Sequence, residues 1–176
     1  MDGPHEQAKH PTSAMLTGPY GHPVHPILVT VPIGAWVASL VFDIASRLVT
    51  DPGFLVQGST WLIGLGVLGA VAAALVGSLD LFGIPTGTRA FRLGLVHMAL
   101  NLVVTTAYAV NFGWRQYGDG QPGPVAAGMI ALSAASMIAL AVSGYLGGEL
   151  TFRYGVRVAD ETTQASGFTS HPPDGR

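Results

Sequence analysis

The chain contains no cysteine and few charged residues. Of its 176 residues only 10% are charged, whereas a soluble domain averages about 25%. The absence of cysteine excludes disulfide bonds, thiolate-bound iron–sulfur clusters, haem attached through cysteine and cysteine nucleophiles. The net charge of −2 gives no basic patch for nucleic acid. A chain of this length has too little interior to bury 49% hydrophobic residues, so we expect a lipid bilayer as its solvent.

Four long segments of the sequence are almost free of charge. A helix needs about 20 apolar residues to cross the hydrocarbon core. The segments that qualify are Ile27–Leu48, Gln57–Leu79, Phe91–Phe112 and Val125–Gly147. None has a polar face, which argues against a water-soluble bundle. Short connections rich in turn residues make consecutive helices antiparallel neighbours. The sequence therefore predicts an all-α, integral membrane four-helix bundle with up-down-up-down topology.

The two ends of the chain differ in composition from its apolar middle. Residues 1–24 are polar and contain proline and histidine, and residues 159–176 are rich in Thr, Ser, Pro and Gly. Such compositions are typical of disordered tails. We therefore expect a transmembrane domain at residues 25–158 between two tails. No cleavable signal peptide is expected, because the first apolar stretch has full membrane length.

The distribution of Lys and Arg predicts the orientation in the membrane. The predicted topology places Lys9, Arg89, Arg92, Arg153 and Arg157 on one side of the bilayer. Only Arg47 and Arg115 fall on the other. An excess of basic residues marks the cytoplasmic side, so both termini are expected in the cytoplasm. Small residues repeat at every fourth position of the second and fourth segments, as in Gly69-Ala73-Gly77, and we interpret them as packing within the bundle.

Each predicted helix brings an ionisable side chain to the cytoplasmic end of the bundle. These residues are His25, with His22 close by, Asp80, His97 and Glu149. In the third helix His97 begins a polar stripe that continues through Asn101, Thr105 and Tyr108, and such a stripe is expected to face the interior. The opposite end has fewer ionisable groups. There we expect Asp43 to pair with Arg47, four residues later on the same helix.

Several of these residues form an ordered series of motifs. The series begins with Gly-His-Pro-Val-His-Pro-Ile-Leu-Val at residues 21–29 and ends with Gly147-Gly148-Glu149-Leu150 running into Tyr154-Gly155-Val156. It resembles the bacterial domain-of-unknown-function 2231 membrane proteins. The resemblance implies a four-helix protein of the bacterial inner membrane without an established activity. Members of this family are sometimes fused to Rieske-type iron–sulfur or cytochrome modules, which implies electron-transfer surroundings and a redox protein partner.

Three functions remain open from the sequence. The first is an interaction or assembly subunit without enzyme activity of its own, whose polar end is a hydrogen-bonded plug. The second is a b-type haem protein, with His97 and either His25 or His22 as axial ligands and Arg89 and Arg92 beside the propionates. The third is a divalent metal site, whose donors would be His25, His97, Asp80 and Glu149. Besides lipid, a second copy of the chain is a further expected partner.

Overall fold

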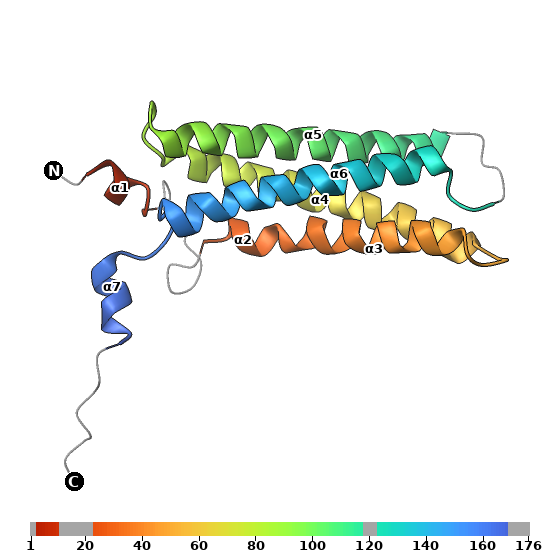
Figure 1. Ribbon diagram of the computed structural model, residues 1–176, viewed down its shortest axis with the longest axis horizontal. Coiled ribbons are helices and arrows are strands. Elements are labelled where there is room, and N and C mark those ends of the chain that lie inside the picture. Colours follow the sequence, from red (N-terminus) through yellow and green to blue (C-terminus); the bar gives the residue numbers. More distant parts are fainter. Residues whose placement is uncertain (1–2, 11–22, 118–122, 169–176) are drawn as a thin grey trace, which may run out of the picture.

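The structure is a computed structural model that describes residues 3–10, 23–117 and 123–168. Its elements are helices, and Figure 1 shows the long helices α3, α4, α5 and α6 lying side by side along one axis. In chain order they are α1 (Pro4–Gln7), α2 (His25–Leu28), α3 (Thr30–Ser46), α4 (Gly53–Phe82), α5 (Arg89–Tyr117), α6 (Ala127–Gly148), the π-helical turn η3 (Glu149–Arg153) and α7 (Glu161–Ser166).

Four of the helical stretches are long and apolar enough to cross a membrane. They are His25–Ser46, Gly53–Phe82, Arg89–Tyr117 and Ala127–Arg153. The first combines α2 with α3 and the last combines α6 with η3. The predicted all-α membrane bundle is confirmed. Helices α4 and α5 extend beyond the predicted apolar segments at both ends, and in α5 the added residues include Arg89 and Arg115.

The helices pack in the order of the chain. Helix α3 lies against α4, α4 against α5 and α5 against α6, and a smaller contact between α6 and α3 closes the bundle. Helices α3 and α5 therefore run in the same direction on opposite corners. Figure 1 shows α1 and α7 at one end of the bundle, which we call the terminal end. The opposite end, where α3 turns into α4, is the loop end.

An apolar layer fills the middle of the bundle. It consists of the buried residues Trp36, Ile63, Ala70, Val104 and Tyr108. The rings of Trp36 and Tyr108 stack at 4.1 Å between centroids and 9° between planes. This contact accounts for a tryptophan in the middle of a membrane helix, where interfacial anchoring offers no explanation. The outer surface of the helices carries large apolar side chains, as expected for contact with lipid.

Short helices occupy part of both segments that were expected to be disordered. Lys9, just after α1, donates hydrogen bonds from Nζ to both carboxylate oxygens of Glu161 in α7, at 2.6 and 2.7 Å. The Arg157 backbone N–H donates to the Ala8 carbonyl at 3.0 Å. Helix α7 begins where the Asp160 side chain accepts a hydrogen bond from the Thr163 N–H, an N-cap. The two tails thus contact each other, while the boundaries of the three regions stay a prediction.

Candidate functional site: two buried polar layers

Two histidines form the centre of the polar layer at the terminal end. His25, the first residue of α2, places Nδ1 2.9 Å from the Ala73 carbonyl oxygen of α4. His97 of α5 places Nδ1 2.8 Å from the Ser143 carbonyl oxygen of α6. A carbonyl oxygen can only accept, so Nδ1 is the protonated nitrogen in both hydrogen bonds. Each imidazole therefore connects its membrane span to the next membrane span in the chain.

A glycine makes room for each of these rings. A Cβ atom at position 77 would lie 2.7 Å from the His25 ring, and one at position 147 would lie 3.0 Å from the His97 ring. Real Cβ atoms rarely or never approach so closely. The small residues Gly77 and Gly147 therefore serve packing within the bundle, as the sequence indicated.

The second ring nitrogen of His97 also has a partner. Asn101, one turn further along α5, donates from Nδ2 to His97 Nε2 at 3.1 Å and to the His97 carbonyl at 2.9 Å. The Ser143 hydroxyl donates to the same carbonyl at 3.2 Å. An iron or metal ion at His97 Nε2 would have to displace Asn101. For His25, the structure gives a hydrogen-bond partner to Nδ1.

The four residues predicted to form one cluster have different partners. Asp80 lies 3.0 Å from Arg157 Nε, and its charge also interacts with His25. His25 in turn interacts electrostatically with His97. The Glu149 carboxylate instead lies 2.8 Å from Arg153 on its own helix. Within the described ranges, no three His, Asp or Glu side chains are grouped so that they could hold a metal ion.

The remaining predicted ligands contribute less to this layer. Arg89 and Arg92 lie exposed at the start of α5. His22 lies outside the described residues. The structure therefore brings His25, His97 and Asp80 to one end of the bundle, and the haem and metal assignments stay predictions.

A second polar layer, at the loop end, surrounds a buried ion pair. Arg115 of α5 binds Asp43 of α3 through two parallel contacts, Nη2 to Oδ2 at 2.7 Å and Nη1 to Oδ1 at 2.9 Å. Their side chains are 4% and 0% exposed. The Ser59 hydroxyl donates to Asp43 Oδ1 at 2.5 Å, and Asn111 Oδ1 accepts from Arg115 Nε at 3.0 Å. A buried ion pair of this kind needs such additional hydrogen bonds to compensate for lost water.

The layer continues into the fourth membrane helix. Asn111 donates from Nδ2 to the Ser133 hydroxyl at 2.9 Å and to the Met129 carbonyl at 3.0 Å. The Ser46 hydroxyl accepts from the Val125 N–H at 3.1 Å. The loop-end layer therefore connects all four membrane helices by hydrogen bonds or ion pairs.

The expected ion pair between Asp43 and Arg47 is wrong. Asp43 faces the interior, whereas Arg47 is the exposed C-cap of α3 and donates to the Val125 carbonyl at 2.8 Å. Arg115 reaches Asp43 from the diagonal helix instead. The expectation of fewer groups at this end concerned ionisable groups alone, and this end also holds many uncharged polar groups. Its polar groups are mostly uncharged residues, which a search for ionisable side chains overlooks.

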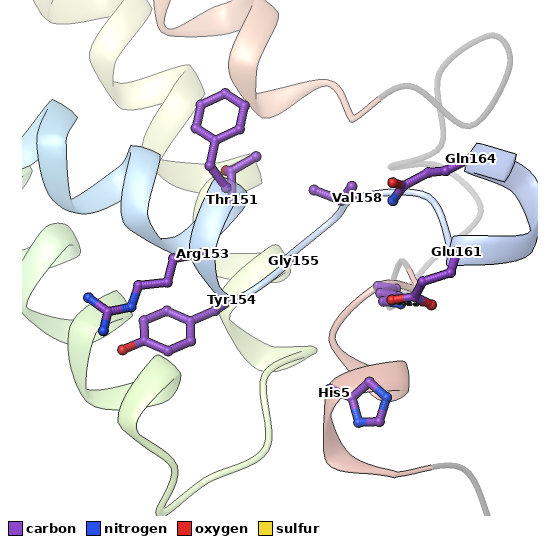
Figure 2. A pocket seen from close by; sticks show the side chains of 10 residues that line it. His5, Thr151, Arg153, Tyr154, Gly155, Val158, Glu161 and Gln164 are labelled. Atoms are coloured by element: carbon purple, nitrogen blue, oxygen red, sulfur yellow. Dashed lines mark hydrogen bonds and ion pairs between the residues drawn. The ribbon is translucent and has the colours of Figure 1, made fainter. Parts of the chain in front are cut away.

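A surface pocket lies outside the bundle at the terminal end. Figure 2 shows Thr151 and Arg153 of η3 on one side of it, and Glu161 of α7 and His5 of α1 on the other. Its ionic groups are paired: Arg153 with Glu149, and Glu161 with Lys9. The Arg153 guanidinium carbon also lies 5.8 Å from the centre of the Tyr154 ring. The pocket is thus an open surface between paired charges and is separate from both polar layers.

Comparison with known proteins identifies the family. Residues 21–160 match the family of predicted membrane proteins DUF2231, so the chain belongs to it and the resemblance of the sequence motifs is confirmed. No curated protein and no solved structure matches the chain.

Proposed function

We propose that the protein is a membrane-embedded interaction or assembly subunit without enzyme chemistry of its own. The observation that carries this proposal is the saturation of its strongest polar groups by partners inside the chain. Both ring nitrogens of His97 are engaged, and the Asp43 carboxylate is bound by Arg115 and Ser59. Such contacts fix helices against one another and leave the surface of the bundle for partners.

The central apolar layer supports the same proposal. It separates the Asp43–Arg115 layer from the histidine layer, and it contains the stacked rings of Trp36 and Tyr108. A bundle closed in this way suits a rigid component of a larger membrane assembly. Helices α4 and α5 run without a break, which fits this role better than it fits a transporter built on interrupted helices.

One observation favours a second candidate, a haem or metal protein. Metal-ligating histidines usually donate their other ring N–H to a carbonyl or carboxylate, and both His25 and His97 donate Nδ1–H to a backbone carbonyl. In that case His25 and His97 would supply Nε2 as ligands after Asn101 moves away. Arg89 and Arg92 would pair with haem propionates, or Asp80 and Glu149 would complete a divalent metal site. An electron-transfer role with a redox protein partner would follow.

An absorption spectrum and metal analysis of the detergent-purified full chain distinguish these candidates. For the assembly subunit we expect no Soret band, no stoichiometric metal, and a lower melting temperature in His97→Ala. His5→Ala, at an exposed histidine of α1, is the matched control. A Soret band that His97→Ala removes and His5→Ala retains would establish the haem protein. Bound metal that falls in His25→Ala, His97→Ala or Asp80→Ala would establish the metal site.

Cross-linking in intact membranes tests the assembly role directly. A photoreactive amino acid in place of exposed Trp61 or Tyr145 samples the outer faces of α4 and α6. We expect a discrete protein adduct from at least one exposed face, either with a second copy or with another membrane protein. Adducts with lipid alone at every exposed position tested would contradict the proposal.

We also propose that the protein lies in the bacterial inner membrane with both termini in the cytoplasm. Lys and Arg residues at the terminal end outnumber those at the loop end, which supports this orientation. Those at the terminal end include the exposed residues Arg89, Arg92 and Arg153. The chain has no cysteine, so single cysteines at Gly123 and Thr162 can be labelled without background. We expect an impermeant reagent to label position 123 from outside and position 162 only after permeabilisation. Labelling of both from the same side would exclude this topology.

A further inference from the structure

The two halves of the bundle make matching contacts at a constant spacing in the sequence. On α2–α3 and α5, the interior side chains that make these contacts are 72 residues apart, which is the separation of Asp43 from Arg115. The pairs are His25 with His97, Trp36 with Tyr108, Ser39 with Asn111, and Asp43 with Arg115. These residues contact positions on α4 in the first half and on α6 in the second half. The equivalent positions of α4 and α6 are also separated by a constant number of residues, slightly smaller than 72.

The histidine contacts match in their carbonyl acceptor and in the glycine beside the ring. Nδ1 of His25 bonds the Ala73 carbonyl, and Nδ1 of His97 bonds the Ser143 carbonyl. Four residues after each carbonyl, a glycine packs against the ring: Gly77 in the first half and Gly147 in the second. The acceptor and the glycine therefore recur at the same offset, which carries position 73 to 143 and position 77 to 147.

Contacts of the aromatic layer follow the same spacing. Trp36 Nε1 donates to the Ile63 carbonyl at 3.4 Å, and the Tyr108 hydroxyl donates to the Ser133 carbonyl at 3.2 Å. The offset between Ile63 and Ser133 equals the offset between the two carbonyls that the histidines bind. Two different side chains thus reach carbonyls at equivalent positions of the neighbouring helix.

A third contact repeats closer to the loop end. The Ser59 hydroxyl, which donates its one hydrogen to Asp43, also lies 3.1 Å from the Ser39 carbonyl oxygen. In the other half, Asn111 donates from Nδ2 to the Met129 carbonyl at 3.0 Å. Positions 59 and 129 are related by the same offset as 63 and 133, so equivalent positions lie in contact in the two halves.

We propose that α2–α4 and α5–η3 are two copies of one helical hairpin, and that the inner face of each copy is an interaction surface for a hairpin of the same kind. A pseudo-twofold axis along the bundle relates them, as in membrane proteins built from parallel repeats. Equivalent residues meet at this axis: the Trp36 and Tyr108 rings stack, and Asp43 binds Arg115.

The charges at the equivalent positions 43 and 115 determine which hairpins pair. Two copies with Asp43 would bring two buried carboxylates together, and two copies with Arg115 would bring two guanidinium groups together. Such like-charge contacts are strongly unfavourable in a buried site. The pairing of unlike hairpins, which lie within one chain, is therefore the favoured one.

The equivalence also predicts a contact of Tyr108 that can be tested. Gly66 accommodates the indole of Trp36, because a Cβ atom there would collide with Nε1. The equivalent residue on α6 is Ser136, which is buried. A serine at this position suits the smaller ring of Tyr108, whereas a tryptophan at position 108 requires a glycine at position 136.

Exchange of the two rings in the full-length chain tests this equivalence. We expect the variant Trp36→Tyr/Tyr108→Trp to melt about 5 °C or more below the wild type in detergent, because the new indole is overpacked against Ser136. Adding Ser136→Gly should recover at least half of the loss. The matched control adds Ala134→Gly, a glycine two residues away on the same helix, and should recover nothing. The Ser136→Gly single variant gives the cost of the glycine alone.

Each outcome of this experiment bears on the proposal. Recovery with Ser136→Gly but not with Ala134→Gly supports the internal repeat. Equal behaviour of the two glycine variants, or a ring exchange that costs nothing without Ser136→Gly, would overturn it. If the ring exchange alone does not yield folded protein, the yield of monodisperse protein in the two triple variants gives the same comparison.

Discussion

The loop end and the terminal end of the bundle bury polar groups in two different ways. At the loop end, a carboxylate and a guanidinium that are almost completely buried compensate each other across the diagonal between α3 and α5. At the terminal end, His25 and His97 each bind a backbone carbonyl of the adjacent helix. A buried charge is stable only while its counter-charge is present. A buried imidazole that binds a backbone carbonyl is stable only while the two helices stay closely packed. The two ends should therefore respond differently to substitution.

The largest effect is expected from Arg115→Ala at the loop end. This substitution leaves the Asp43 carboxylate buried without its counter-charge, which should lower the free energy of unfolding by about 3–5 kcal/mol. Arg153→Ala is the matched control, because Arg153 also pairs with a carboxylate but is 63% exposed. Its loss should be about 1 kcal/mol or less. Denaturation in detergent measures both, and equal losses would show that burial does not set the cost.

Removal of both charges should be far less harmful than removal of one. The variant Asp43→Leu/Arg115→Met leaves no unpaired charge, and apolar replacements of buried ion pairs are often neutral or stabilising. We expect it to unfold within about 2 kcal/mol of the wild type, well above Arg115→Ala. In this variant Ser59 loses its contacts with both charged residues and Asn111 loses its contact with Arg115, which sets the remaining cost. A double variant as unstable as Arg115→Ala would mean that the pair contributes more than charge compensation.

Packing should dominate at the terminal end. Gly147→Ala places a Cβ atom 3.0 Å from the His97 ring, and overpacking of this kind costs about 1–3 kcal/mol. Gly144→Ala, three residues earlier on α6, has no atom within 4 Å of the added Cβ. The control should be neutral or stabilising by up to about 1 kcal/mol, since alanine favours the helix. Thermal melting compares the two variants. A change in melting temperature of the same sign for both would refute the role of Gly147 in making room for the His97 ring.

The smallest effect concerns the contact between the tails, which depends on pH. Hydrogen bonds from Thr163 lower the pKa of Asp160, and the hydrogen bond with Lys9 lowers the pKa of Glu161. A folded-state pKa below the unfolded value means that the stabilisation is present above about pH 4 and is lost as the pH falls through the folded value. The same hydrogen bond raises the pKa of Lys9. The stabilisation from Lys9 is therefore lost only as the pH rises above about 10.

Hydrogen–deuterium exchange of residues 160–166, corrected for the intrinsic pH dependence, measures this effect. Protection should be constant near neutral pH and fall in acid, with α6 as the internal reference. The variant Asp160→Asn/Glu161→Gln retains a good N-cap residue but cannot titrate at either position. Its protection should change little over the same range. An acid-dependent loss of equal size in wild type and variant would assign the transition to other groups.

The sequence predicted the fold because the bilayer constrains it strongly. A segment of apolar residues as long as Gln57–Leu79 must be helical to satisfy its backbone in lipid, and short connections leave few topologies. The partner of Asp43 could not be predicted in the same way. Spacing along one helix favours Arg47, but the rotation of α3 about its axis decides which side chain meets Asp43, and tertiary packing sets that rotation.

The candidate site was predictable only in part for a similar reason. His25 and His97 stood out because ionisable residues are rare in the apolar segments. Ser59 and Ser133 did not, although both are completely buried and hydrogen-bonded to neighbouring helices. The repeat is not apparent from the sequence because few equivalent positions carry the same residue. His25 and His97 are identical, but Trp36 and Asp43 have different residues at their equivalent positions. Only the backbone oxygens that these side chains contact reveal the correspondence.

The ion pair between Asp43 and Arg115 also has a consequence for the insertion of the helices into the membrane. Asp43 belongs to the first span and Arg115 to the third, and they are 72 residues apart in the chain. At about 5–20 residues per second, the ribosome needs roughly 4 to 14 s to add the third span's arginine after the aspartate has been synthesised. During this interval the first span has a carboxylate without a counter-charge. Because an unpaired charge is costly in lipid, we expect the first span to stay near water or within the insertion machinery until the third span arrives, so that these two spans enter the lipid together.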